Sequence, residues 1–228
     1  LKNADKIRKI YLKVSGSKKP QDWYPFQVIC PKCGKIGTTR VFDFKNEKVE
    51  FICEESLVDW AKGCGYKGKI SPYDGNGKLP WKIEWAAKWF VLETDFEGAG
   101  KDHYTKGGSR DIAEAVAREI YKIEPPVGVR YEFFLVLGRK MASSKGLGVS
   151  ASEIAEVLPP ELLRFLMVKT PIQRPIDFDP EGETIPRLYD FYDEAAEDKK
   201  LAQVFKYSQI EKPVKAFHMR FSKVAYLL

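Results

Sequence analysis

The spacing of apolar positions changes along the chain, and these changes predict segments with different folds. Residues 1–19 favour a helix or connector that ends at "SGSKKP". Short runs rich in β-branched and aromatic residues ("FQVIC", "RVFDF", "KVEFIC") predict a small β-rich unit within residues 26–70. From about residue 78 the pattern becomes that of alternating helices and strands, so the fold class is expected to be α/β.

Residues 94–137 predict a strand, a glycine-rich loop, a helix and a second strand, which is a βαβ unit. "EWAAKWFVLE" before it is expected to be a short helix, and "TDFEG" a buried strand. The helix of the unit has Ser109 as its expected N-cap and Asp111 in its first turn. The apolar stripe of this helix consists of Ile112, Val116, Ile120 and Ile123. Pro125 and Pro126 are expected to end the helix. "VGVRYEFFLVLG" is then expected to be one mostly buried strand of a parallel sheet.

The remaining third of the chain is predicted to be helical. Ser150 and Glu153 have the spacing of a capping box, and the helix that they begin should end before the two prolines 159 and 160. A second helix is expected over "ELLRFLMVK". Residues 184–228 are amphipathic with helical spacing and include the acidic stretch "YDEAAED".

Composition narrows the function only slightly. The 228 residues suit one large or two modest domains, and a hydrophobic content of 44% can form a core. A net charge of +6 is compatible with an anionic partner, but 32 acidic residues interleave with 38 basic ones, as on an ordinary solvated surface. The longest apolar runs have strand length, so no membrane span is expected. The charged start lacks an initiator Met and a secretory signal, from which we expect a cytoplasmic piece of a longer chain.

The four cysteines suggest a metal site. "CPKCG" places Cys30 and Cys33 in a tight knuckle, and ten residues separate Cys53 from Cys64, more than in an ordinary second knuckle. Four thiolates suit tetrahedral zinc and leave no coordination position open for catalysis. Structural zinc is the preferred interpretation. Two disulfides and ordinary buried thiols are the alternatives.

The stretch "GKDHYTKGG" lies between a predicted strand and a predicted helix, at the sheet edge where ligands bind in doubly wound folds. Gly100 would let the backbone approach a ligand, while Asp102 and His103 offer an acceptor and an imidazole. A surface turn with satisfied side chains would look the same. Helical spacing makes Trp85 and Trp89 core residues, whereas Trp81 is placed to reach a pocket.

A basic loop follows the second predicted strand. "KMASSKG" resembles the Lys-Met-Ser-Lys-Ser signature of class I aminoacyl-tRNA synthetases in its longer form. The matching residues are Lys140, Met141, Ser144, Lys145 and Gly146, while Ala142 and Ser143 depart from it. Such a loop brings ammonium groups to a triphosphate where charge develops as pyrophosphate leaves. The missing central lysine makes Lys145 the expected main carrier, with Lys140 second and Ser144 beside them.

Longer segments resemble one family within this class. "PWKIEWAAKWFVLETDFEGAGKDHYTKGGSRD", "VRYEFFLVLGRKMASSKG" and "PPELLRFLMVKTP" are similar to the class I lysyl-tRNA synthetases, from about residue 26 to the end. The resemblance implies the second half of a Rossmann-type nucleotide-binding fold, with an inserted zinc-bearing unit. It also implies a lysine pocket with Trp81, His103 and Tyr131, and ATP contacts from Gly100, Asp102, Met141 and Lys145. Zn²⁺ as structural metal, ATP with Mg²⁺, L-lysine and tRNA(Lys) follow as expected cofactor and partners.

The same resemblance implies three further segments and an incomplete active site. Residues 26–72 would be the zinc-binding insertion, 73–148 the Rossmann-type catalytic half with the lysine-rich loop, and 149–228 a helical stem-contact region with the start of an anticodon-binding domain. Residues 1–25, before the part that carries the resemblance, are expected to form a connector or helix. Class I enzymes need a His-x-Gly-His motif, but this chain holds two histidines, His103 and His218, which do not form one. We therefore expect an internal fragment that is inactive alone.

Two alternatives stay open on the sequence. Another class I synthetase, such as a glutamyl or cysteinyl enzyme, shares the lysine-rich loop, although the aromatic pocket and "WKIEWAAKW" argue against these two. A non-catalytic, zinc-bearing tRNA-binding module would fit the missing histidine motif.

Overall fold

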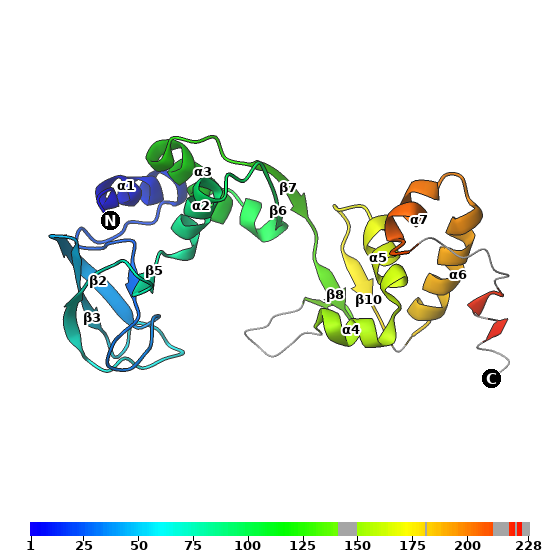
Figure 1. Cartoon of the computed structure of the whole chain (residues 1–228), viewed down its shortest axis with the longest axis horizontal. Coiled ribbons are helices and arrows are strands. Elements are labelled where there is room, and N and C mark those ends of the chain that lie inside the picture. Colours follow the sequence, from blue (N-terminus) through cyan, green and yellow to red (C-terminus); the bar gives the residue numbers. More distant parts are fainter. Residues whose placement is uncertain (141–149, 181, 212–218, 222, 225–228) are drawn as a thin grey trace. The chain divides into compact units, whose positions relative to one another are not determined.

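The computed structural model describes residues 1–140, 150–180, 182–211, 219–221 and 223–224. The chain divides into two compact units, Leu1–Val129 and Arg130–Leu228. Figure 1 shows the elements of each unit. No helix within the described ranges is long and apolar enough to cross a membrane. The four-segment division expected from the sequence stays a prediction.

Three helices of the first unit bury one apolar core. They are α1 (Ala4–Ser15), α2 (Trp81–Val91) and α3 (Ser109–Val116), and α3 continues in a wider turn over Ala117–Tyr121. Their buried faces meet through the residues Ile7, Ile10, Tyr11, Ile83, Trp85, Ala86, Trp89, Ile112, Ala113 and Val116. Ile120 and Ile123 pack against this core, which confirms the apolar stripe predicted for the helix. Burial at roughly 25 cal/mol per Å² of apolar surface is what holds these short helices in place.

The β-rich part of the first unit is built on an antiparallel sheet. β2 (Thr39–Lys45) pairs with β3 (Lys48–Cys53), which pairs with β4 (Lys67–Ile70). Asn46 and Glu47 both have positive φ, as a two-residue hairpin turn requires. A second antiparallel pair consists of β1 (Gln27–Val28) and β5 (Gly77–Lys78), which lie where the chain enters and leaves this part. Its core consists of Phe26, Val28, Val41, Val49 and Phe51.

Two expectations for the βαβ region are wrong. β6 (Phe96–Gly100) pairs with β7 (Val127–Tyr131), but Phe96 is 61% and Val127 69% exposed, so neither is a buried strand. A two-stranded sheet offers few neighbours to cover such side chains. Ser109 is the first helical residue rather than the N-cap, since Gly108 precedes the helix and no side chain caps it. Asp111 does lie in the first turn, where it accepts a hydrogen bond from the Gly107 N–H at 2.8 Å.

The expected long strand of residues 127–138 is broken in two. β7 ends at Tyr131, and β8 (Phe134–Val136) begins a new sheet in the second unit. β8 pairs in parallel with β10 (Ile176–Phe178), an element that the sequence pattern did not suggest, and antiparallel with β9 (Arg139–Lys140). The chain therefore reverses at Leu137 and Gly138 instead of leaving the sheet.

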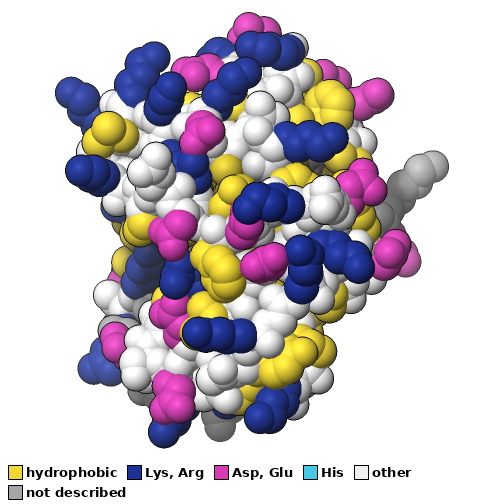
Figure 2. All heavy atoms as spheres, turned by 90° about the vertical axis from the view of Figure 1, so that its left-hand side faces the viewer, with side chains coloured by type: hydrophobic (Ala, Val, Ile, Leu, Met, Phe, Trp, Pro, Cys, Tyr) yellow, Lys and Arg dark blue, Asp and Glu magenta, His cyan; other side chains and the backbone are white. Residues whose placement is uncertain are grey.

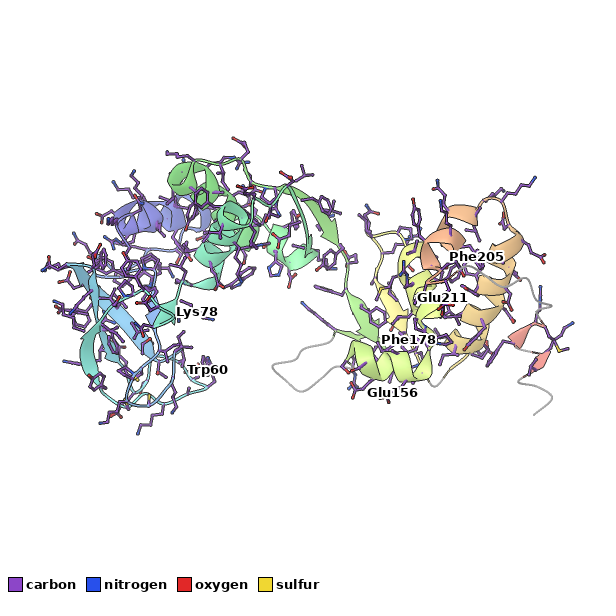
Figure 3. The ribbon with its side chains drawn as sticks, in the orientation of Figure 1. Trp60, Lys78, Glu156, Phe178, Phe205 and Glu211 are labelled. Carbon is purple, nitrogen blue, oxygen red and sulfur yellow. The ribbon has the colours of Figure 1, made fainter. Side chains whose placement is uncertain are left out.

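The second unit packs its helices beside this sheet. They are α4 (Ala151–Val157), α5 (Pro160–Lys169), α6 (Thr184–Glu197) and α7 (Ala202–Ser208). The predicted capping box is confirmed, because Ser150 Oγ accepts from the Glu153 N–H while Glu153 accepts from the Ser150 N–H. Phe178 from β10 and Phe205 from α7 both belong to the core around Phe165 (Figure 3).

Candidate functional site

Four cysteine sulfurs meet at one end of the β-rich part. Cys30 follows β1, Cys33 lies in the next turn, Cys53 ends β3, and Cys64 precedes β4. All four Sγ atoms lie within 4.8 Å of one another. The pairs Cys30–Cys64 and Cys33–Cys53 are each 3.7 Å apart, and all four thiols are free, so the disulfide alternative is wrong.

The sulfur spacing fits a tetrahedral metal. Ligands at about 2.3 Å from a central zinc would lie roughly 3.8 Å from one another, close to the two shortest separations here. The ten-residue loop between Cys53 and Cys64 brings the two sulfurs together because its backbone at Gly63 packs closely against the Glu54 carbonyl. A Cβ at Gly63 would lie 2.0 Å from that oxygen, which excludes any larger residue. The chemistry of the donor set, four sulfurs and no open position, suits a structural ion.

Hydrogen bonds around Cys53 prepare its sulfur to act as a thiolate. Burial alone would raise its pKa, but the Thr38 hydroxyl at 3.2 Å and the Cys64 N–H at 3.3 Å lower the pKa to about 7. Burial raises the pKa of Cys30 to about 11 in the absence of a cation. A metal would stabilise the ionised form of every sulfur in the cluster.

A second cluster is aromatic and lies at the start of α2. Trp81 is 46% exposed, and its ring centroid lies 4.7 Å from that of Trp85 and 5.2 Å from that of His103. Trp85 also meets His103 edge to face at 5.6 Å. Trp85 and Trp89 are buried, as the helical spacing predicted. The structure thus brings together two of the three residues expected in a lysine pocket.

The remaining residues expected near the ligand have these positions. Tyr131 ends β7, lies in the second unit and is 47% exposed. Gly100 ends β6 with φ of −59°, an ordinary value for any residue. Asp102 lies in the short 3-10 helix Lys101–Tyr104 and is exposed. That helix occupies part of the segment expected to be a loop. The ligand roles of these residues stay predictions.

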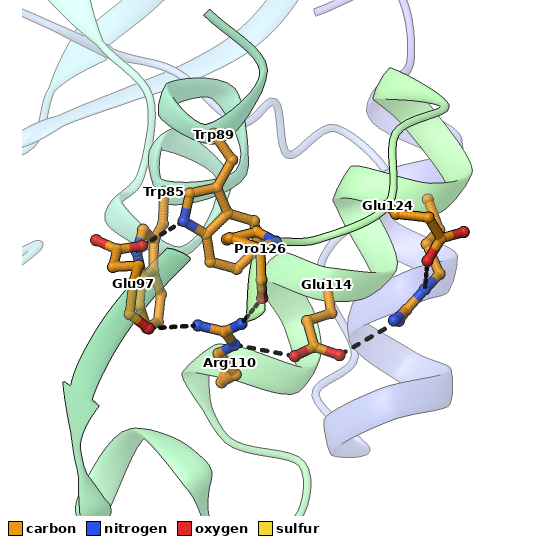
Figure 4. A network of polar contacts seen from close by, with 8 residues as sticks. Trp85, Trp89, Glu97, Arg110, Glu114, Glu124 and Pro126 are labelled. Atoms are coloured by element: carbon orange, nitrogen blue, oxygen red, sulfur yellow. Dashed lines mark hydrogen bonds and ion pairs between the residues drawn. The ribbon is translucent and has the colours of Figure 1, made fainter. Parts of the chain in front are cut away.

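A polar network of Glu97, Arg110 and Glu114 holds the indole rings of Trp85 and Trp89 (Figure 4). Glu97 Oε2 accepts hydrogen bonds from the indole N–H groups of both Trp85, at 2.7 Å, and Trp89. Arg110 is only 2% exposed, and its guanidinium lies 4.8 Å from the Trp89 ring centroid. It donates to the Pro126 carbonyl at 2.5 Å and to Glu114 at 2.9 Å. The buried charge of Arg110 is therefore paired with the Glu114 carboxylate.

The lysine-rich loop begins from a tight hairpin. Leu137 and Gly138, between β8 and β9, both have positive φ, and Lys140 faces Leu135 across the hairpin. The Gly138 N–H donates to Asp177 Oδ1 at 2.8 Å, which ties the turn to β10. Lys140 Nζ lies 3.8 Å from the Phe133 ring centroid. Met141, Ser144 and Lys145 lie outside the described residues.

Sequence reasoning missed Glu97, Arg110, Thr38 and Gly63. Glu97 lies in a predicted strand and Arg110 in a predicted helix, so both were read as part of an element. Their partners were unknown until the fold placed α2 beside β6 and α3. A signal did exist for Gly63: "KGCG" carries a glycine on each side of Cys64, as expected where backbone passes close to backbone.

Comparison with known proteins shows the family to which the chain belongs. The family model described as "tRNA synthetases class I (K)" matches residues 1–220. The chain belongs to this family of class I tRNA synthetases. The match includes residues 1–25, so the resemblance extends farther toward the N-terminus than the segments quoted from the sequence had indicated.

Curated relatives of the synthetase family include archaeal proteins called lysine–tRNA ligase. The chain is 38% identical to that of Thermoplasma acidophilum over 237 aligned residues, which cover 100% of this chain and 45% of that protein. It is 43% identical to lysine–tRNA ligase 1 of Methanosarcina acetivorans, over 85% of this chain and 35% of that protein. The Thermoplasma volcanium ligase is 37% identical over the whole chain. The chain thus spans between about a third and a half of the length of these relatives.

Proposed function

We propose that this chain forms part of a lysine–tRNA ligase. The observation that carries the proposal is the class I (K) family match over residues 1–220 together with lysine–tRNA ligases 37–43% identical to the chain. The edge-to-face contact of Trp81 with His103 supports it, because an aromatic surface beside an imidazole suits the aliphatic stem and ammonium of lysine.

The reaction has two steps. The carboxylate of L-lysine attacks the α-phosphorus of ATP, and lysyl-adenylate forms as pyrophosphate leaves. A terminal ribose hydroxyl of tRNA(Lys) then attacks the lysyl carbonyl, and AMP leaves. Neither step needs a side-chain nucleophile, so catalysis comes from positioning and from charge stabilisation.

We assign the roles as follows. Trp81, His103 and Tyr131 would line the pocket for the lysine side chain. Gly100, Asp102, Met141 and Lys145 would contact ATP, which would carry Mg²⁺ on its phosphates. Lys145, with Lys140 and Ser144, would stabilise the leaving pyrophosphate.

Residues 73–148 would be the second half of a Rossmann-type fold, and 149–228 a helical region that contacts tRNA. Exposed apolar side chains on β6 and β7, such as Phe96 and Val127, support this because the helices that pack on the faces of a complete doubly wound sheet would cover them. The zinc unit would be an insertion that the metal stabilises. On the face in Figure 2, Lys and Arg are interspersed with Asp and Glu, so the attraction for tRNA would be local rather than spread over that face. We expect the ligase to work in the cytoplasm.

Transfer of lysine to RNA tests the whole proposal. A full-length ligase that carries this sequence should charge a tRNA(Lys) transcript with lysine and leave a glutamate or cysteine tRNA uncharged. The 228-residue chain has two histidines and no His-x-Gly-His motif, so we expect no lysine-dependent pyrophosphate exchange from it alone. Binding of tRNA without any charging by the full-length protein would favour the non-catalytic alternative.

A further inference from the structure

Glu97 ties two successive turns of α2 to strand β6. Its Oε2 atom accepts the indole N–H of Trp85 at 2.7 Å and the indole N–H of Trp89. Hydrogen bonds to an ionised acceptor are among the stronger ones in proteins. One oxygen therefore fixes the rotation of both indole rings, and Figure 4 shows them converging on it.

The ring of Trp85 contacts the two more exposed rings of the cluster, Trp81 and His103. Its ring lies 4.7 Å from Trp81 at an interplanar angle of 34°, and 5.6 Å from His103 at 69°. Trp85 is 7% exposed, so neighbouring atoms leave its ring little room to turn, whereas Trp81 is 46% exposed. A rotation of Trp85 would thus displace both rings that face outward.

The opposite side of the indoles is also fixed. The Arg110 guanidinium lies 4.8 Å from the Trp89 centroid and 5.9 Å from the Trp85 centroid. Arg110 is held in turn by Glu114 and by the Pro126 carbonyl. Glu97 and Glu114 are thus two carboxylates of one network, but only Glu97 bonds directly to the indoles.

We propose that Glu97 is a positioning residue for recognition of the lysine side chain, acting through Trp85 on Trp81 and His103. The inference rests on the proposed lysine pocket. A carboxylate suits this role better than an amide because it accepts two N–H groups without having to orient an NH₂ group of its own. Loss of the indole acceptor should loosen the two outward rings and weaken lysine binding. ATP binding should change little, because the residues proposed to contact ATP are not among these rings.

The test compares three variants in a full-length ligase that carries this sequence. Glu97→Met removes the acceptor at similar size, Glu97→Gln keeps an acceptor but removes the charge, and Glu114→Gln perturbs the same network without touching an indole. Lysine-dependent and ATP-dependent pyrophosphate exchange are measured at a temperature where all three are folded. We expect the KM for lysine to rise about tenfold in Glu97→Met and less in Glu97→Gln, with the KM for ATP within about twofold. Glu114→Gln should leave both constants within about twofold.

The outcomes separate the inference from the function beneath it. If the unaltered ligase activates lysine but neither Glu97 variant changes its KM, or if both substrates are affected equally, the positioning role is wrong. If the unaltered ligase does not activate lysine at all, the proposed function fails first. Tryptophan fluorescence of the 228-residue chain gives an independent readout, because all five tryptophans lie in residues 23–89. Glu97→Met should shift this emission, and an unchanged spectrum would contradict the proposed coupling to the indoles.

Discussion

The ring of Trp81 meets the ring of His103 edge to face, with centroids 5.2 Å apart and planes at 81°. The two residues come from different elements, the start of α2 and the 3-10 helix that follows β6. Both remain partly accessible, and Trp85 packs behind them. This pair is the part of the proposed lysine pocket that the geometry supports most directly.

Loss of the imidazole should affect lysine more than ATP. In a full-length ligase that carries this sequence, His103→Ala should raise the KM for lysine about tenfold or more and change the KM for ATP little, because the imidazole faces the aromatic pair. Tyr131→Ala should act in the same direction if Tyr131 joins the pocket. Trp60→Ala is a suitable control, because Trp60 is 75% exposed on the loop between Cys53 and Cys64 (Figure 3). Equal effects on both substrates would mean that His103 and Tyr131 are structural.

The cysteine cluster should bind one zinc per chain. Protein purified without chelator should contain about one equivalent by elemental analysis, with sulfur at roughly 2.3 Å in X-ray absorption. Cys53→Ser should abolish stoichiometric binding and lower the melting temperature, since the metal closes a small β-rich part with a core of few residues. Ser56→Ala, in the loop between Cys53 and Cys64, serves as the control and should keep the metal. Metal-free native protein would overturn the assignment.

The positive φ angles in the hairpin that precedes the lysine-rich loop predict that substitutions at Gly138 and Leu137 change stability in opposite directions. Gly138 has φ of +70°, so Gly138→Ala should reduce the free energy of unfolding of the second unit by about 1 kcal/mol. Leu137 has φ of +51°, and Asn tolerates positive φ better than Leu does. Leu137→Asn should therefore increase the free energy of unfolding of the second unit by a few tenths of a kcal/mol. Urea unfolding followed by helical circular dichroism measures both. Tryptophan fluorescence should stay unchanged, because no tryptophan lies in the second unit. Effects of equal sign would contradict the turn geometry.

Lys145 is proposed as the main contact to the leaving pyrophosphate. In the full-length ligase, Lys145→Ala should lower the rate of lysyl-adenylate formation on the order of 10² to 10³, with ATP binding in the ground state little changed. Lys140→Ala should have a smaller effect, because Lys140 lies in β9 at the base of the loop and over the Phe133 ring. A rate within about threefold of the unaltered enzyme for Lys145→Ala would transfer the role to Lys140 or to neither. Single-turnover adenylation separates the two.

The sequence predicted those features whose causes are local. The capping box of Ser150 and Glu153 and the apolar stripe of α3 depend on residues within a few positions of one another. The cysteine cluster was also predictable, because the residue type itself carries the chemistry.

Features set by distant partners could not be predicted in the same way. The hairpin turn at Leu137 and Gly138 was missed because leucine is not a typical turn residue, and the turn depends on Asp177 of β10, which accepts a hydrogen bond from the Gly138 N–H. The role of Glu97 depends on which indoles lie beside β6, and no periodicity encodes that choice. Lys145 illustrates a third case, since its proposed role rests on resemblance and it lies outside the described residues.

The most direct test of the central claim is amino-acid-dependent ATP–pyrophosphate exchange by a full-length ligase that carries this sequence, run in parallel with each of the twenty amino acids. We predict exchange above background with lysine alone, and loss of most of that signal at low lysine concentration in His103→Ala. Exchange driven by glutamate, cysteine or another amino acid, or by none of the twenty, would contradict the account.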